Sequence, residues 1–130
     1  MRDIPEDLTY TRNHEWVRAL DHGLVEIGIT DHAQAALGDL VFVELPEVGR
    51  QVAAGDAFAW VESVKAASDV YSPVSGRIAA SNIVLSDKPD LVNHAPYAAG
   101  WFIRVQVDGA APKVELFNAE QYQTWLIDQS

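Results

Sequence analysis

The stretch spanning residues 57–76 constrains the fold of this chain more than any other. An apolar run over 57–61 is typical of a β-strand, and a second such run covers 69–73. Two apolar strands separated by so few residues indicate a β-hairpin. Its turn, within 63–68, holds neither the glycine nor the asparagine that tight hairpin turns favour for positive φ. It holds Lys65 instead, and a local rule broken at one spot is where function is expected.

Lys65 is predicted to stand at the tip of this hairpin, followed by small residues. A primary amine in that position is accessible to another protein's active site. It is therefore suited to covalent attachment, and acylation would remove its charge. Position alone favours the simpler interpretation, an ordinary solvated turn lysine, because lysines are mostly exposed.

The charge balance excludes some partners. The chain has 19 acidic residues against nine Lys and Arg, giving a formal net charge of −10. Binding to nucleic acid needs clustered cations, and so does binding to anionic membrane surfaces. No apolar run approaches the length of a membrane span. We therefore expect neither nucleic acid nor membrane as a partner.

The chain contains no cysteine. Disulfides, cysteine catalysis and thiolate metal sites are therefore excluded. If the protein takes part in thiol chemistry, the sulfur must come from an attached group. The chemistry would then belong to that group.

Nothing in the sequence indicates a metal centre or a catalytic pair. The four histidines, at positions 14, 22, 32 and 94, lack zinc-type spacing, so no metal site is predicted. No pair among the 19 carboxylates stands out for acid–base catalysis. Most of these acids are interpreted as a solvated surface.

The 130 residues suggest a single domain over 1–130. Besides the lysine hairpin at about 57–76, alternating apolar residues predict the strands 10–19, 24–29, 39–45, 76–82 and 101–107. In 39–45 we expect Val41 and Val43 to share a face. Residues 85–90 read as a turn-rich connection and 91–93 as a brief helical turn.

Two helices are predicted. The first covers about 30–38, with Thr30 or Asp31 as its cap, and Asp31 with Gln34 resembles a capping box. The second, at about 119–127, begins after Asn118 as N-cap.

A weak internal repeat surrounds the hairpin. Residues 46–50 (Pro-Glu-Val-Gly-Arg) match 73–77 (Pro-Val-Ser-Gly-Arg) in their Pro, Gly and Arg. Such short matches arise by accident. The alternative is that two similar half-sandwiches meet at the lysine turn.

Several longer motifs carry a resemblance to a known family. They are residues 14–17 (His-Glu-Trp-Val), 28–34 (Gly-Ile-Thr-Asp-His-Ala-Gln), 37–39 (Leu-Gly-Asp), 41–46 (Val-Phe-Val-Glu-Leu-Pro), 62–76, 91–93 (Leu-Val-Asn), 96–97 (Pro-Tyr) and 100–101 (Gly-Trp). In this order, across roughly residues 8 to 127, they resemble the glycine cleavage system H proteins. Residues 62–76 resemble that family's lipoyl-attachment motif.

The resemblance implies a fold and a function. The fold is mainly β, a lipoyl-domain-like barrel-sandwich hybrid of antiparallel strands with short helices and a C-terminal helix. The function is that of a carrier, not an enzyme, with lipoate in amide linkage on Lys65 as a swinging arm. The carrier takes the aminomethyl group of glycine from glycine decarboxylase (P protein) to aminomethyltransferase (T protein). Dihydrolipoamide dehydrogenase (L protein) then reoxidises it, and lipoyl-attaching enzymes are further partners.

The resemblance also implies roles for three carboxylates. Glu62 lies three residues before the lysine and is expected to aid recognition by a modifying enzyme. Glu15 and Asp69 match family positions, and we expect them to line a cleft in which the loaded arm docks, where a carboxylate can hold a cationic amine. Ala36 departs from the family, because some members carry histidine there.

Other kinds of lysine-modified carrier differ from this chain in the residues around the lysine. Biotin carriers flank their lysine with methionines, whereas Val64 and Ala66 stand here and the only methionine is Met1. Lipoyl domains of 2-oxo acid dehydrogenases more often carry Asp-Lys-Ala within long multidomain chains. A lipoyl relay, donating lipoate to other lipoyl domains, stays open, and an unmodified structural domain is disfavoured by the motif.

The N-terminal residues predict a location. Residues 1–8 contain no apolar signal segment, and their acidity differs from a mitochondrial transit peptide. We expect a cytoplasmic bacterial protein. A mature organellar protein whose presequence has been removed is the alternative.

Overall fold

A computed structural model describes residues 3–109 and 114–129. Its strands are β1 (Thr9–Tyr10), β2 (Glu15–Ala19), β3 (Leu24–Ile29), β4 (Leu40–Glu44), β5 (Gln51–Val52), β6 (Ala57–Ser63), β7 (Ala67–Tyr71), β8 (Gly76–Ser81) and β9 (Ile103–Val107). Its helices are the 3-10 helix η1 (Asp21–Gly23) and the α-helices α1 (Asp31–Leu37), α2 (Val84–Asp87), α3 (Leu91–His94) and α4 (Ala119–Asp128).

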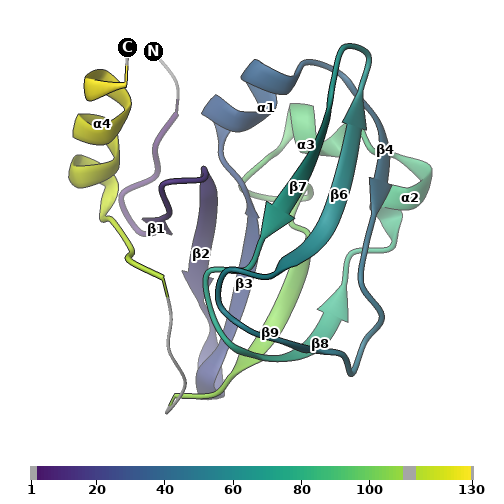
Figure 1. Cartoon of the computed structure of the whole chain (residues 1–130), viewed down its shortest axis with the longest axis vertical. Coiled ribbons are helices and arrows are strands. Elements are labelled where there is room, and N and C mark those ends of the chain that lie inside the picture. Colours follow the sequence, from purple (N-terminus) through teal and green to yellow (C-terminus); the bar gives the residue numbers. More distant parts are fainter. Residues whose placement is uncertain (1–2, 110–113, 130) are drawn as a thin grey trace.

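The strands form two antiparallel sheets (Figure 1). The larger sheet has the order β1-β2-β3-β9-β8-β5, and the smaller has the order β4-β6-β7. Register is set by the alternation of buried side chains, since a one-residue slip would turn a whole strand's apolar set to solvent. The predicted fold, antiparallel β-sheets with short helices and a C-terminal helix, is confirmed.

The main core lies between the two sheets. The larger sheet contributes Ile27, Ile78, Ile103 and Val105, and the smaller contributes Leu40, Val43, Phe58, Val61 and Val70. Each fully buried side chain of this size stabilises the fold by about 1.5–3 kcal/mol relative to leaving it exposed. Because both sheets supply this core, the smaller sheet and its hairpin are fixed over the larger one.

A second apolar cluster joins α4 to the first strands. It consists of Leu8, Tyr10, Trp16 and Tyr122, with Trp125 and Leu126 packed against it. Tyr10 and Tyr122 stack with their ring centroids 4.6 Å apart. Figure 1 shows α4 standing beside β1, at one side of the molecule. The predicted N-cap Asn118 is confirmed, and it forms a capping box with Gln121 through reciprocal hydrogen bonds.

Four local expectations prove wrong. The strand predicted over 10–19 is two short strands, β1 and β2, separated by a turn. A register shift between Leu40 and Phe42 turns Val41 outward, so Val41 is exposed while Val43 is buried. The capping box expected from Asp31 and Gln34 does not form: Thr30, one of the two predicted caps, is the N-cap of α1 and accepts a hydrogen bond from the Ala33 N–H, while Gln34 Nε2 donates to the Asp31 side chain. The connection after β8 contains the helix α2.

The repeated Pro, Gly and Arg segments lie next to one another. The strands that adjoin them, β5 and β8, pair antiparallel. Backbone hydrogen bonds extend this pairing, from Gly49 N–H to Ile78 C=O at 2.8 Å and from Ile78 N–H to Arg50 C=O at 2.9 Å. The two copies therefore lie side by side.

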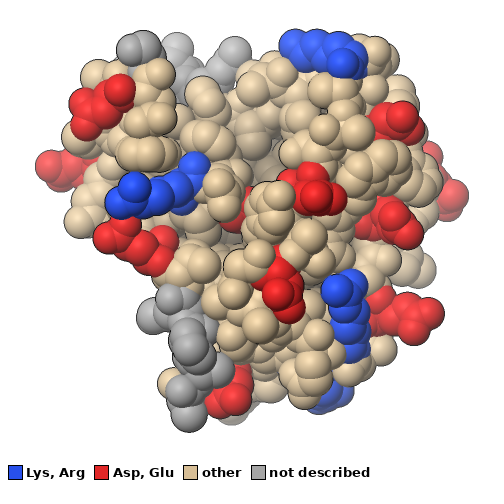
Figure 2. Space-filling view, viewed as in Figure 1, with Lys and Arg blue, Asp and Glu red and all other residues tan. Residues whose placement is uncertain are grey.

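The charged surface reflects the excess of acidic over basic residues in the sequence. On the face drawn in Figure 2, acidic groups are spread among uncharged ones and the basic groups do not gather into one patch. No helix within the described residues has the length and apolar character needed to cross a membrane.

Candidate functional site

The tip of the β6–β7 hairpin is closed by a serine side chain. Ser63 Oγ accepts hydrogen bonds from the backbone N–H groups of Lys65 at 3.2 Å and Ala66 at 3.0 Å. The Ser63 N–H donates to the Ala66 carbonyl at 2.7 Å. In the described chain the non-glycine residues with positive φ are His14 and His22, so the turn needs no left-handed residue. The serine explains how a hairpin without Gly or Asn closes here.

Lys65 is exposed, and its side chain crosses Gly38 at the end of α1. A Cβ added to Gly38 would lie 3.3 Å from Lys65 Cε and 3.9 Å from Nζ. Gly38 has φ +83° and caps α1. The absence of a side chain therefore serves both the helix end and the passage of the lysine stem.

Asn93 fixes this end of α1. Its Nδ2 donates to the Gly38 carbonyl at 2.8 Å and to Gln34 Oε1 at 3.0 Å. Its Oδ1 accepts from the Leu40 N–H at 2.9 Å. One amide side chain thus joins α3, α1 and β4 beneath the lysine. The 91–93 motif was recognised by resemblance alone, without a reason for its asparagine.

A cleft of about 170 Å³ lies between α1, the start of β2 and the hairpin. Residues that line it include His14, Glu15, Ala33, Ala36, Leu37 and Asp69. The structure therefore places Glu15 and Asp69 on one cleft, beside the helix that Lys65 crosses. Ala36 contributes only a methyl group to the wall.

Glu15 is a buried carboxyl group, 3 % exposed. Burial raises its pKa to about 7, opposed by hydrogen bonds from the Thr11 hydroxyl at 2.6 Å and from the Tyr71 backbone N–H. Glu15 also lines a second cavity of about 140 Å³, on the side of Thr11 and Tyr71. Near neutral pH this group is poised between its two protonation states, and a nearby cation would favour the charged one.

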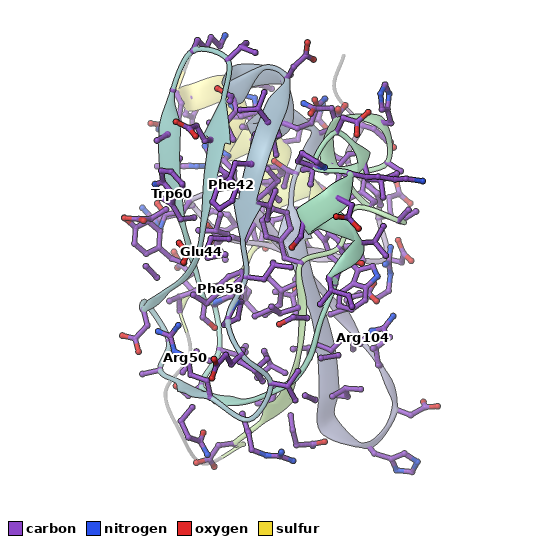
Figure 3. All side chains as sticks on the ribbon, turned by 90° about the vertical axis from the view of Figure 1, so that its right-hand side faces the viewer. Phe42, Glu44, Arg50, Phe58, Trp60 and Arg104 are labelled. Atoms are coloured by element: carbon purple, nitrogen blue, oxygen red, sulfur yellow. The ribbon has the colours of Figure 1, made fainter. Side chains whose placement is uncertain are left out.

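Asp69 and Glu62 lie on different parts of the hairpin. Asp69 is exposed and pairs in register with Trp60. Glu62 is exposed on the outer side of β6, where it pairs with Phe42, and it is not among the cleft residues. On this side of the smaller sheet Phe42 and Trp60 pack edge to face, 5.5 Å apart (Figure 3).

His14 precedes β2 and has a left-handed backbone, with φ +69°. Its Nδ1 lies 2.8 Å from the Tyr122 hydroxyl. Burial, together with the neighbouring His32, lowers the pKa of His14 to about 4. The sequence does not indicate this contact of Tyr122, because a helical pattern does not say where a hydroxyl group points.

No group of three or more His, Asp or Glu among the described residues is placed to hold a metal ion. The site is therefore an exposed lysine beside a small cleft with one buried and one exposed carboxylate.

Comparison with known proteins agrees with this arrangement. Residues 8–129 match the sequence model of the family described as Glycine cleavage H-protein. The chain is 54% identical over 129 residues to the Glycine cleavage system H protein of Aeromonas salmonicida (strain A449), covering 99% of each chain. It is 50% identical to that of Escherichia coli O139:H28, covering 99% of this chain and 100% of the relative.

A solved structure is similar as well. The crystal structure of a glycine cleavage system H protein from Mycobacterium marinum superimposes with a TM-score of 0.85 at 44% identity, covering 93% of this chain and 97% of the other. The chain therefore belongs to the glycine cleavage H-protein family, whose members are non-catalytic carriers with a covalent lipoyl-lysine.

Proposed function

We propose that Lys65 is the lipoyl-bearing lysine of this carrier. The observation that carries the proposal is the placement of Lys65: exposed at a serine-closed hairpin tip and crossing Gly38 at the edge of a cleft. An attaching enzyme needs an accessible amine on a defined backbone, and both conditions are met.

The surrounding residues fit an attached lipoyl group. Gly38 leaves the lysine stem unobstructed, and the apolar residues Ala33, Ala36 and Leu37 line the adjoining cleft. When attached, the group supplies the redox and carrier chemistry by which the glycine cleavage system moves an aminomethyl group from the P protein to the T protein, with reoxidation by the L protein. A mobile tether raises the effective concentration at each partner's active site.

The cleft gives the loaded arm a resting place. An aminomethyl group carries a cationic amine, and we propose that Glu15 and Asp69 hold it. Glu15 is shielded from water, so an ion pair there is stronger than one at the surface. The amine would lower the pKa of Glu15 from about 7, so docking is coupled to loss of a proton.

Glu62 is assigned a different role. It lies outside the cleft, on the exposed side of β6 near the lysine turn. We propose that lipoyl-attaching enzymes contact it, as the position of this glutamate in the attachment motif suggests. A histidine at position 36 would have lined the cleft, and Ala36 cannot provide that contact.

The experiment is an intact-mass measurement of protein purified from cells supplied with lipoate. We expect the added mass of one lipoyl group on the peptide containing Lys65, and none in Lys65→Arg. Lys88→Arg is the matched control, because it changes another lysine outside the hairpin. An unmodified mass, where another lipoyl protein is fully modified, would refute the assignment.

The docking role has its own test. The lifetime of the loaded arm should shorten in Glu15→Gln and Asp69→Asn, whereas Glu62→Gln should leave it unchanged. If the loaded arm has the same lifetime in all three variants and in the unchanged protein, Glu15 and Asp69 do not hold the arm.

We also propose a cytoplasmic location in a bacterium, which the bacterial origin of the relatives supports. Fractionation of source cells, followed by immunoblotting, tests it; recovery in the periplasmic or membrane fraction would contradict it.

A further inference from the structure

We propose that Tyr122, on the C-terminal helix α4, is a positioning residue for the arm-docking cleft. Its hydroxyl group ties together the two walls of the cleft formed by His14 and α1. This inference rests on the docking role proposed above for the cleft.

The contacts of Tyr122 are specific. Its side chain is fully buried, and its hydroxyl lies 2.8 Å from His14 Nδ1 and 2.9 Å from Thr30 Oγ1. Its ring stacks on Tyr10 at an interplanar angle of 9°. The stacking requires only an aromatic ring. The hydroxyl is a buried polar group, and both of its partners belong to the elements that form the cleft.

Thr30 holds the wall of the cleft that α1 forms. It is the N-cap of α1, and its hydroxyl oxygen also accepts from the Ala33 N–H at 3.2 Å. Ala33, Ala36 and Leu37 of α1 face the cleft. A shift of the Thr30 side chain would therefore alter the start of the helix that carries these residues.

His14 forms part of the opposite wall of the cleft. It lines the cleft itself and directly precedes Glu15, the buried carboxyl. Its backbone is in the left-handed region, which a non-glycine residue keeps only where its surroundings hold it. The contacts that hold it include the Tyr122 hydroxyl at the ring and two backbone hydrogen bonds, from the Thr30 N–H to the His14 carbonyl at 3.0 Å and from the His14 N–H to the Thr11 carbonyl at 3.2 Å. Losing the phenol would free the imidazole and loosen the residue beside Glu15.

The protonation of His14 agrees with this role. Its ring is close to that of His32, with centroids 4.7 Å apart, and its low pKa keeps it neutral near pH 7. A neutral imidazole has one nitrogen that donates and one that accepts, so Nδ1 can pair with a hydroxyl in either direction. The link between α4 and the cleft therefore persists at physiological pH.

The experiment compares Tyr122→Phe with Tyr10→Phe. The two changes remove a phenol hydroxyl from the same stacked pair. Tyr10 donates to the Pro5 carbonyl at 2.5 Å, away from the cleft lining, so its variant is the matched control. Both lipoylated proteins are loaded with the aminomethyl group, and decay of the loaded form is followed well below the unfolding temperature. We expect Tyr122→Phe to shorten the lifetime about five- to tenfold, as for loss of one hydrogen bond, and Tyr10→Phe to leave it unchanged.

A second readout does not depend on the attached group. NMR spectra of unlipoylated protein should show shifted signals for the cleft residues His14 and Ala33 in Tyr122→Phe and not in Tyr10→Phe, because only the first change removes a contact to His14 and Thr30. A merely stabilising hydroxyl would lower the melting temperature without this difference.

The outcomes separate the two proposals. If the loaded arm is protected in the unchanged protein and both variants decay like it, with the NMR signals of His14 and Ala33 unmoved, Tyr122 has no positioning role. If the unchanged protein protects its arm no better than a short lipoylated peptide does, the docking proposal fails and takes this inference with it.

Discussion

Gly38 shows how much of the site depends on a missing side chain. It ends α1 in a left-handed conformation, and the stem of Lys65 passes over its Cα. The sequence identifies Gly38 as a helix stop. Only the structure shows that it also makes room for the residue that is modified, because the two lie 27 positions apart in sequence (65 − 38) and meet through the packing of α1 against the hairpin.

Replacing Gly38 by alanine tests this dual role. We expect Gly38→Ala to lower the free energy of unfolding by about 1–2 kcal/mol, because alanine is strained at positive φ. We also expect slower lipoylation, because the new methyl group would crowd Lys65 Cε at 3.3 Å. Denaturant titration and the time course of modification by a lipoate ligase measure the two effects.

Gly49→Ala is the control for strain. Gly49 has φ +96°, and a Cβ there would meet nothing within 4 Å. It should therefore lose stability without slowing lipoylation. If the two variants are lipoylated equally fast, contact with Lys65 is not what Gly38 provides.

At the scale of elements, the β6–β7 hairpin is the unit that presents the lysine. Ser63 is buried at 6 % exposure and closes the turn through its side chain and backbone. The hairpin strands extend to Ser63 and begin again at Ala67, so the turn is shorter than the sequence predicted. A short turn with internal hydrogen bonds holds the lysine backbone in one place for an attaching enzyme.

Ser63→Ala should therefore affect both stability and modification. Two part-buried hydrogen bonds from the backbone N–H groups of Lys65 and Ala66 are lost, so we expect a loss of about 1–3 kcal/mol in the free energy of unfolding and a several-fold lower lipoylation rate. Ser68→Ala on β7, whose hydroxyl donates to the neighbouring Asp69 carbonyl at 3.2 Å and not to the turn, should change neither appreciably. A Ser63→Ala protein modified at the unchanged rate would show that the turn is held by its strands alone.

The elements also show which features could be predicted. The hairpin, the 24–29 strand and the capped α4 depend on nearby residues, and period-2 alternation or an N-cap reveals them. The bulge in β4 depends on its pairing with β6, so the faces of Val41 and Val43 could not be read from alternation. The contact between His14 and Tyr122 joins residues 108 positions apart, and no local pattern encodes it.

At the scale of the whole molecule, the buried Glu15 and the half-buried His14 beside it make the free energy of unfolding depend on pH in opposite directions. The pKa of Glu15 is raised from 4.5 to about 7, so its favourable contribution is complete below pH 4.5 and is lost as the pH rises through 7. The pKa of His14 is lowered from 6.5 to about 4, so its contribution is complete above pH 6.5 and is lost as the pH falls through 4. Between about pH 4.5 and 6.5, Glu15 makes the free energy of unfolding fall with rising pH, whereas His14 makes it rise.

Glu15→Gln should remove one of these two opposing pH dependences. Glutamine resembles the protonated acid and does not titrate, so only the His14 slope remains, and stability should rise with pH more steeply than in the unchanged protein. The difference in the free energy of unfolding should be near zero at pH 4 and grow to at most about 3 kcal/mol in favour of the variant at pH 8, since one pKa unit is worth about 1.4 kcal/mol. Denaturant titrations across this range measure it, with Glu62→Gln as the control for loss of an exposed negative charge.

Parallel stability curves for Glu15→Gln and the unchanged protein would mean that Glu15 ionises equally easily in the folded and unfolded chain. Growth of the difference with pH would mean instead that the fold keeps a destabilising carboxylate where the cationic cargo is proposed to dock.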